Sequence, residues 1–155
     1  MDSKRIKLSD ISPVMLEVLE AGGEVTLTIT GTSMLPLLVA GRDTVTLKKP
    51  DGRLEKCDLP LYRRTEGAFV LHRVVRVTSD SYVMCGDNQF LLEAPIYDNQ
   101  IIGVVTRIKR KGKSFEVTSP GYRAYCRVWT ALLTVRYPLR RLRFFASRLR
   151  RTNGK

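Results

Sequence analysis

The stretch "EVTLTITGTSMLPLLVAGRDTVTLKK", residues 24–49, places two alternating segments on either side of a loop. In residues 24–30 and again in residues 43–49, polar and apolar side chains alternate, which is typical of strands with one buried face. The segment between them has a proline and a Gly-Arg-Asp turn, so we expect it to be a loop. The stretch therefore predicts a strand–loop–strand unit with Ser33 in the loop.

Similar strand-like segments follow along the chain. Turn residues predict two hairpins, one around Thr78-Ser79-Asp80 and one around Lys111-Gly112-Lys113. A short helix is expected at residues 12–21, with Ser12 as its N-cap and Gly22-Gly23 at its end. The other predicted strands are residues 59–64, 67–77, 81–86, 100–110 and 114–118. Seven short strands and one small helix indicate a mainly β, antiparallel domain.

The pattern changes after Pro120-Gly121. Apolar and aromatic side chains then recur at intervals of three and four residues, which predicts an amphipathic helix. Pro138 is expected to break or kink this helix, and a second basic amphipathic segment follows it. The chain therefore divides into a β domain with its N-terminal helix, residues 1–119, and a basic helical tail, residues 120–155.

Most of the net charge of +12 belongs to this tail. Ten of the 27 Lys and Arg residues and none of the 15 Asp and Glu residues lie after residue 116. Arginines mixed with aromatic and aliphatic residues favour an anionic membrane surface as a partner of the Arg-rich segment 122–151. A helix packed on the β domain with a solvated basic face explains the pattern equally well. Nucleic acid is not expected, because no recognisable reading module accompanies the charge.

Cysteines and apolar runs limit the expected location of the protein. Cys57, Cys85 and Cys126 are odd in number and widely spaced, which fits neither a disulfide framework nor a zinc site, so we expect small apolar residues in a reducing compartment. The N-terminus lacks the apolar run of a secretory signal. The longest uncharged apolar run, residues 128–135, is too short for a bilayer, which needs roughly 20 residues. We expect a cytoplasmic protein whose tail can reach the inner membrane surface.

Ser33 and His72 are the residues with the chemistry for nucleophilic catalysis. A serine hydroxyl needs a neighbouring base, and His72 is the only histidine in the chain. Each residue alone also has an ordinary structural interpretation, Ser33 as a loop serine and His72 as a strand histidine. Asp87 in "CGDNQ" alone is explained by an Asx-turn that closes a hairpin.

Four short motifs resemble, in their order, those of the S24/S26 serine peptidase superfamily: Gly31-Thr32-Ser33-Met34-Leu35-Pro36, Gly41-Arg42-Asp43, His72-Arg73 and Gly86-Asp87-Asn88. The His-Arg pair is similar to that of signal peptidase I of the Ser-His type, found in the endoplasmic reticulum and in archaea. The resemblance covers residues 24–108 and implies an antiparallel signal-peptidase/SOS-repressor-like β domain.

This resemblance implies roles for the residues of the first motif. Ser33 is the expected nucleophile and His72 its general base, while Met34 and Pro36 shape the loop that presents Ser33. Gly31 stands two residues before the nucleophile, where the family often has a hydroxyl side chain that contributes to the oxyanion hole. The backbone N–H of Ser33 is then the expected donor, with Thr30 or Thr32 as a helper.

The resemblance also implies an acid that orients the histidine. Asp87 and Glu93 are both candidates, and we favour Glu93 for contact with His72 and Asp87 for holding its own loop together. No cofactor and no metal is implied.

The expected activity is that of a serine endopeptidase which cuts a leader-like segment of a precursor peptide or protein through a Ser-His dyad. Two alternatives stay open. One is a self-cleaving repressor-type S24 peptidase, although that branch uses lysine as its base and has a helix-turn-helix segment. The other is a catalytically inactive β module that binds peptides or membranes.

Overall fold

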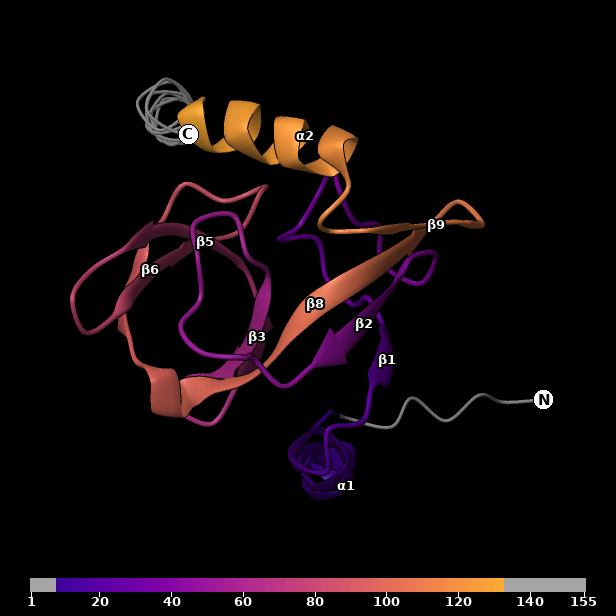
Figure 1. Ribbon diagram of the computed structural model, residues 1–155, viewed down its shortest axis with the longest axis vertical. Helices are drawn as coiled ribbons and strands as arrows, with labels where there is room; N and C mark the ends of the chain where they lie inside the picture. Colours follow the sequence, from indigo (N-terminus) through magenta and orange to yellow (C-terminus); the bar gives the residue numbers. More distant parts are fainter. Residues whose placement is uncertain (1–7, 133–155) are drawn as a thin grey trace, which may run out of the picture.

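The computed structural model describes residues 8–132 (Figure 1). The part of the basic tail that follows residue 132, with the expected kink at Pro138, lies outside the described residues. The described helices and strands lie within the predicted β domain and the first helix of the predicted tail.

Helix α1 (Leu8–Glu20) begins earlier than the sequence predicts. Pro13 lies inside the helix rather than in its first turn, so Ser12 is not the N-cap. A proline has the φ angle of a helix, but it removes its own N–H bond and its ring crowds the carbonyl of residue i−4, so a helix continues past it at a cost in stability. Gly22 and Gly23 end the helix as predicted, donating their N–H groups to the carbonyls of Leu19 and Val18.

A six-stranded antiparallel sheet forms the larger part of the domain. Its order is β1 (Val25–Thr28), β2 (Thr44–Lys48), β8 (Ile101–Arg110), β3 (Pro60–Arg63) and β4 (Phe69–Leu71), and β9 (Lys113–Glu116) pairs with the end of β8. β8 is the longest strand and pairs with three others, so it is the centre of the sheet. β1 and β4 are the two ends of this strand order, and β9, which pairs only with β8, is a further edge.

A second sheet of three antiparallel strands contains β5 (Arg73–Val77), β6 (Tyr82–Cys85) and β7 (Glu93–Ile96). The sequence predicted residues 67–77 as one strand, but the segment divides at His72. Leu71 pairs with Leu61 in the first sheet, and Arg73 pairs with Cys85 in the second. His72 therefore lies where the chain passes from one sheet to the other.

Strand β7 was missed by the sequence prediction because Pro95 lies inside it. The strand is at the edge of the three-stranded sheet, where a missing N–H donor is tolerated. A short 3-10 helix, Asp98–Gln100, then leads into β8.

Two apolar cores meet at β3. Leu61 belongs to the larger core, and Tyr62, which points to the other face of the strand, belongs to the smaller one. α1 contributes Met15 and Leu19 to the larger core. The smaller core lies within the curled strands on the left of Figure 1 and contains Leu54, Tyr62, Val74, Tyr82, Met84 and Ile96.

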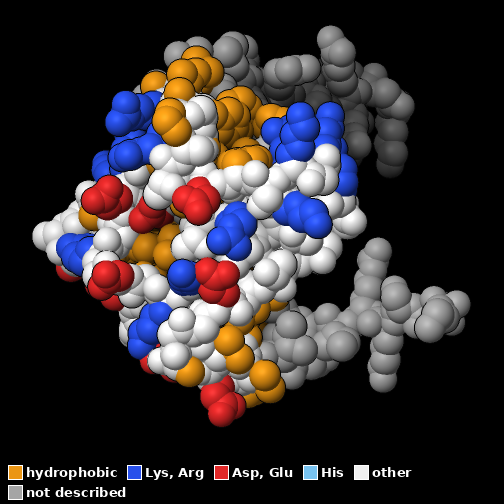
Figure 2. All heavy atoms as spheres, turned by 45° about the vertical axis from the view of Figure 1, so that its right-hand side comes forward, with side chains coloured by type: hydrophobic (Ala, Val, Ile, Leu, Met, Phe, Trp, Pro, Cys, Tyr) orange, Lys and Arg blue, Asp and Glu red, His pale blue; other side chains and the backbone are white. Residues whose placement is uncertain are grey.

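Helix α2 (Pro120–Ala131) lies across the end of the domain opposite α1 (Figure 1). Tyr122 and Cys126 face inward and join the larger core. On the face shown in Figure 2, hydrophobic side chains gather at the height of α2, with Lys and Arg side chains on both sides of them. Among residues 8–132, no helix has the length and the apolar character needed to cross a membrane.

The prediction of a mainly β, antiparallel domain is confirmed. The particular family fold stays a prediction.

Candidate active site

The loop between β1 and β2 carries Ser33 and is closed at its base. The N–H of Ile29 donates to the carbonyl of Asp43 at 2.9 Å, and the N–H of Gly41 donates to the carbonyl of Ile29 at 2.9 Å. The fully buried Asp43 carboxylate also accepts from the Val39 N–H and from the Arg42 guanidinium, each at 2.8 Å. The hydrogen bond from Arg42 is the main reason that the pKa of Asp43 is lowered to about 2.

Ser33 is half-buried near the middle of this loop. Gly31, with φ of +77°, supplies the left-handed backbone conformation just before it. Met34 is 3% exposed and belongs to the larger core, so it fixes the other side of the serine. Thr32 and Pro36 are exposed, and the Pro36 carbonyl accepts a hydrogen bond from Arg110 at 3.1 Å.

The Gly86-Asp87-Asn88 turn docks directly on the Ser33 backbone. The N–H of Asn88 donates to the Ser33 carbonyl at 2.7 Å, and its side-chain amide donates to the Thr32 carbonyl at 3.2 Å. A Cβ at Gly86 would lie 2.8 Å from the Ser33 carbonyl oxygen, so this position has no room for a side chain. Two motifs that are distant in the sequence are thus held together by backbone contacts.

His72 lines the same cavity as Ser33. The cavity has a volume of about 290 Å³, and the His72 side chain is almost fully buried at its wall. β1 and β4, the first and last strands in the order of the six-stranded sheet, both contribute to the lining. The apolar part of the lining includes Leu27, Ile29, Met34, Val45, Leu61 and Phe69.

Two side chains contact the Nδ1 atom of His72. Nδ1 lies 3.2 Å from the Tyr62 hydroxyl and 3.2 Å from Oε1 of Glu93. Tyr62 donates its only proton to Oε2 of Glu93 at 2.9 Å, so its oxygen faces Nδ1 as an acceptor. Both neighbours of Nδ1 are acceptors, and the proton of a neutral ring therefore belongs on Nδ1, leaving the lone pair on Nε2.

Burial keeps the His72 ring neutral at neutral pH. Burial lowers the pKa of His72, although the nearby Glu93 acts in the opposite direction, so the neutral ring is favoured. Burial also raises the pKa of Glu93, but hydrogen bonds from Arg64 and Tyr62 outweigh it, so the net pKa of Glu93 is lowered. Burial and the neighbouring carboxylate raise the pKa of Tyr62, which stays a proton donor.

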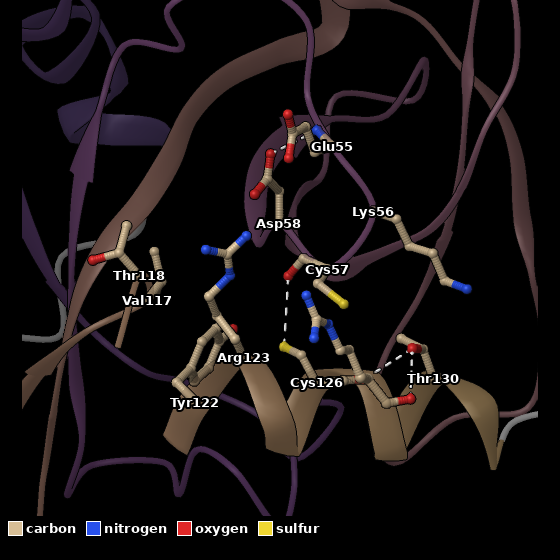
Figure 3. Close-up of a pocket in the computed structure, with 11 residues that line it drawn as sticks. Glu55, Lys56, Cys57, Asp58, Val117, Thr118, Tyr122, Arg123, Cys126 and Thr130 are labelled. Carbon is tan, nitrogen blue, oxygen red and sulfur yellow. Dashed lines mark hydrogen bonds between the residues drawn. The ribbon is translucent and has the colours of Figure 1, made fainter. Parts of the chain in front are cut away.

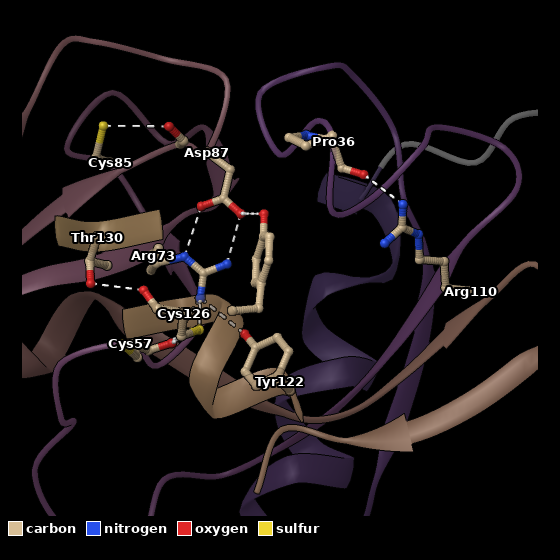
Figure 4. Close-up of polar contacts among 11 residues, drawn as sticks. Pro36, Cys57, Arg73, Cys85, Asp87, Arg110, Tyr122, Cys126 and Thr130 are labelled. Atoms are coloured by element: carbon tan, nitrogen blue, oxygen red, sulfur yellow. Dashed lines mark hydrogen bonds and ion pairs between the residues drawn. The ribbon is translucent and has the colours of Figure 1, made fainter. Parts of the chain in front are cut away.

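Asp87 pairs with the residue after His72, Arg73 (Figure 4). The Arg73 guanidinium donates to both Asp87 oxygens, at 2.8 and 2.7 Å, and both side chains are 1% exposed. Tyr125 of α2 donates to Asp87 at 3.2 Å, and Arg73 donates to the Tyr122 hydroxyl at 3.1 Å. Of the two candidate acids, Glu93 is the one at the histidine, and Asp87 ties its loop to α2.

Sequence reasoning missed Tyr62 and Arg64. Arg64 holds the Glu93 carboxylate with two guanidinium nitrogens, one of them at 2.8 Å. The signal for both residues was present, because positions two apart on the predicted strand 59–64 point to the same face. The sequence around His72, however, does not indicate which face of the predicted strand 59–64 the histidine would contact.

A second cavity, of about 470 Å³, lies between α2 and the loop that joins β2 to β3 (Figure 3). It shares no lining residue with the Ser33 cavity, and its walls include Cys57 and Cys126. These cysteines are distant in the sequence but neighbours in space. Within the described part of the chain, no group of three or more His, Cys, Asp or Glu side chains is arranged to hold a metal ion.

Comparisons of the chain with protein-family models, with curated proteins and with solved structures give no match. The site is therefore interpreted from its own geometry and from the sequence motifs.

Proposed function

We propose that this protein is a serine endopeptidase of the S24/S26 type, with Ser33 as nucleophile and His72 as general base. The observation that carries the proposal is that both residues line one cavity while Glu93 and Tyr62 engage the Nδ1 side of the imidazole. A serine that lines one cavity with an imidazole whose far nitrogen is held by a carboxylate supplies the groups that acyl transfer uses.

In the proposed reaction, Nε2 of His72 takes the Ser33 proton as the hydroxyl attacks the carbonyl carbon of the peptide bond. The imidazolium that forms is stabilised by the Glu93 carboxylate, which accepts the Nδ1 proton in a hydrogen bond. The imidazolium then gives its proton to the leaving amine, and an acyl-enzyme remains on Ser33. Water releases the acyl group by the same steps, with His72 again as the base.

The oxyanion of the tetrahedral intermediate needs donors near Ser33. The Ser33 backbone N–H is the first candidate, as the sequence predicts. Between the two proposed helpers, the geometry favours Thr30, because Thr30 lines the Ser33 cavity and Thr32 does not. One such donor typically accounts for about 10²–10³ in rate.

The proposed substrate is an extended segment of a precursor peptide or protein. β1 and β4 are edge strands whose residues line the cavity, and an edge strand offers unpaired backbone groups to an extended peptide. The cavity of about 290 Å³ suits small and medium apolar side chains next to the cut bond. This is consistent with the leader-like segment that the sequence motifs imply.

The test uses a panel of leader-type peptides with small residues at the candidate sites, and mass spectrometry of the products. We expect cleavage by the parent and by Ser114→Ala, an exposed serine on β9, but not by Ser33→Ala or His72→Ala. Cleavage that survives Ser33→Ala would contradict the assignment of the nucleophile. Binding without cleavage by all four proteins would favour the inactive peptide-binding module.

An anionic membrane surface is proposed as a partner of the basic segment 122–151, of which residues 122–132 are described. The supporting observation is α2, on which Arg123 and Arg127 are exposed at the mouth of the second cavity and Val128 and Leu132 are 60% and 41% exposed. Cations next to exposed apolar side chains suit the boundary between lipid headgroups and acyl chains.

Vesicle co-sedimentation tests this partner. We expect binding to vesicles with anionic lipids, no binding to neutral vesicles, and weaker binding of the Arg123→Glu/Arg127→Glu variant. The matched control is Lys109→Glu/Lys113→Glu, which changes the net charge equally on β8 and β9. Equal losses in both variants would assign the effect to net charge rather than to α2.

A further inference from the structure

The second cavity holds two thiols that no step of the proposed peptidase mechanism uses. Cys57 lies in the loop between β2 and β3, and Cys126 lies on the inner face of α2. Cys126 Sγ is 3.8 Å from the carbonyl oxygen of Cys57, and both residues line the cavity of about 470 Å³ (Figure 3). The third cysteine, Cys85, is buried on β6 and does not line this cavity.

The backbone at Cys57 is held in an unusual conformation. Its φ angle is +88°, a region that residues with a Cβ rarely adopt. Hydrogen bonds fix it on both sides, since its N–H donates to the Val74 carbonyl at 2.9 Å and its carbonyl accepts from Arg73 at 3.2 Å. Backbone strain that the surroundings maintain is most often found at functional positions.

We propose that Cys57 and Cys126 are a redox-active pair, which a small-molecule disulfide such as oxidised glutathione converts into an intramolecular disulfide. Because a carbonyl oxygen lies about 2.4 Å from its own Cα, Cys126 Sγ is within about 6 Å of the Cys57 Cα. Because Cys126 Sγ lies about 2.8 Å from its own Cα, the two Cα atoms are within about 9 Å of each other, whereas a disulfide joins Cα atoms about 4.4–6.8 Å apart. Closure then needs side-chain rotation and a small approach of α2 to the loop, not a rearrangement of the sheets.

The exchange proceeds in two steps. The Cys57 thiolate attacks one sulfur of oxidised glutathione, which forms a mixed disulfide and releases one glutathione thiolate. The Cys126 thiolate then attacks the Cys57 sulfur and releases the second glutathione. The two cysteines lose two electrons and two protons in total, and the two released glutathione thiols carry them.

The two thiols are suited to different steps. Cys57 is half-exposed in the cavity, whereas Cys126 is 0% exposed, so the oxidant meets Cys57 first. Burial raises the pKa of Cys126 to about 11, and the Cys57 thiol contributes to the increase, while the adjacent Arg73 opposes it. When Cys57 enters the mixed disulfide its contribution is removed, and Arg73 remains to support the Cys126 thiolate.

Charged side chains of the cavity suit an anionic disulfide. Lys56, Arg123 and Arg127 line the walls, and their positive charges favour the carboxylates of glutathione. Glu55 and Asp58 line it as well, but one Asp58 oxygen is engaged by the Glu55 backbone N–H at 2.8 Å. The pair does not depend on the proposed peptidase activity, and its test needs no substrate.

The test incubates the full chain with oxidised glutathione, alkylates the remaining thiols and maps the peptides by mass spectrometry. We expect a Cys57–Cys126 cross-linked peptide, an alkylated Cys85, and a rise in Tm of about 10 °C that a dithiol reductant reverses. Cys85→Ser is expected to keep the cross-link and the Tm shift, and Cys57→Ser is expected to lose both.

A further variant separates the two steps. In Cys126→Ser we expect Cys57 to stop at a stable glutathione adduct, which identifies Cys57 as the first thiol to react. If Cys126→Ser does not fold, the Cys57→Ser and Cys85→Ser variants still show whether Cys57, and not Cys85, is needed for the cross-link. The proposal is overturned if the parent chain gives only a glutathione adduct, only unreacted thiols, or a cross-link that includes Cys85.

Discussion

His72 and Arg73 are consecutive in the chain and equally buried, but His72 lies at the wall of a cavity and Arg73 lies in a buried ion pair. His72 contacts Glu93 and Tyr62 through one ring nitrogen and lines the Ser33 cavity. Arg73 instead gives its guanidinium to Asp87, to side chains of α2 and to a backbone carbonyl. The chain passes from the first sheet to the second at His72, so the two consecutive residues meet different neighbours.

The difference separates a reactive site from its support. The surroundings of His72 are only partly enclosed, since the side chains of Glu93 and Arg64 are 20% and 34% exposed. The pKa of His72 is lowered, so the ring is neutral at neutral pH and its lone pair is available to accept a proton. Burial lowers the pKa of Arg73, but the Asp87 hydrogen bonds and its other neighbours outweigh it, so the net pKa is raised and the residue stays charged. We therefore expect changes at His72 to affect catalysis and changes at Arg73 to affect stability.

The largest expected effect is on the histidine side of the comparison. His72→Ala is expected to lower kcat/KM for a cleaved peptide by about 10⁴-fold or more, because the serine loses its base. Its free energy of unfolding should fall by less than about 2 kcal/mol, since Glu93 keeps its bonds to Arg64 and Tyr62. Peptide kinetics and urea unfolding on the same preparation measure both. A loss of activity explained by unfolding would contradict the separation.

The arginine side is tested by Asp87→Ala, which leaves the Arg73 charge buried without its carboxylate. We expect the free energy of unfolding to fall by about 3–5 kcal/mol, measured by urea titration. The double variant Arg73→Met/Asp87→Leu removes both charges at similar volume and should recover at least half of that loss. If Asp87→Ala were as stable as the parent, the Arg73–Asp87 ion pair would not hold α2 to the domain.

Glu93→Gln tests the contact with His72, because it removes the negative charge but keeps the shape of the side chain. We expect kcat to fall by about 10–100-fold, because the imidazolium loses its carboxylate. Glu93 raises the pKa of His72, so its removal lowers that pKa further and moves the acid limb of kcat/KM to lower pH. Glu66→Gln, which removes the exposed second partner of Arg64, is the control and should leave the pH profile in place. A shift to higher pH would contradict the assigned contact.

The smallest effect is expected at the base of the Ser33 loop. Asp43 has a folded-state pKa of about 2, below its ordinary 3.8, so its stabilisation is present above the ordinary pKa and is lost as the pH falls toward 2. Asp43→Asn should lower the free energy of unfolding by about 1–2 kcal/mol at neutral pH, since the partner Arg42 is partly exposed and its charge is screened by water. The gap between parent and variant should narrow at about pH 3. A constant gap would show that Arg42 does not stabilise the carboxylate.

The sequence was most informative where local pattern decides the structure. The alternation in residues 24–30 and 43–49 predicts β1 and β2, because each has one face on the core. The same rule failed at residues 67–77, where the apolar pattern continues through His72 although the pairing partner changes from β3 to β6. Pairing partners are long-range contacts that local pattern does not contain.

The candidate site was predictable to a similar extent. The motifs identify Ser33 and His72, and Glu93 was favoured over Asp87 for contact with the histidine. Tyr62, Arg64 and Tyr125 were not found, because their roles arise where β3, β7 and α2 meet the two motifs in space. The neighbourhood of Cys57 and Cys126 was missed for the same reason.

The most direct test of the account is an NMR pH titration of His72, which is the only histidine in the chain and so gives an unambiguous imidazole signal. Long-range ¹⁵N–¹H correlations report which ring nitrogen carries the proton, and the titration midpoint gives the pKa. We predict a neutral ring protonated at Nδ1, with a midpoint below the ordinary value of 6.5. A proton on Nε2 would contradict the claim that Glu93 and Tyr62 orient His72, and a midpoint above 6.5 would contradict the claim that burial keeps the ring neutral and available as a base.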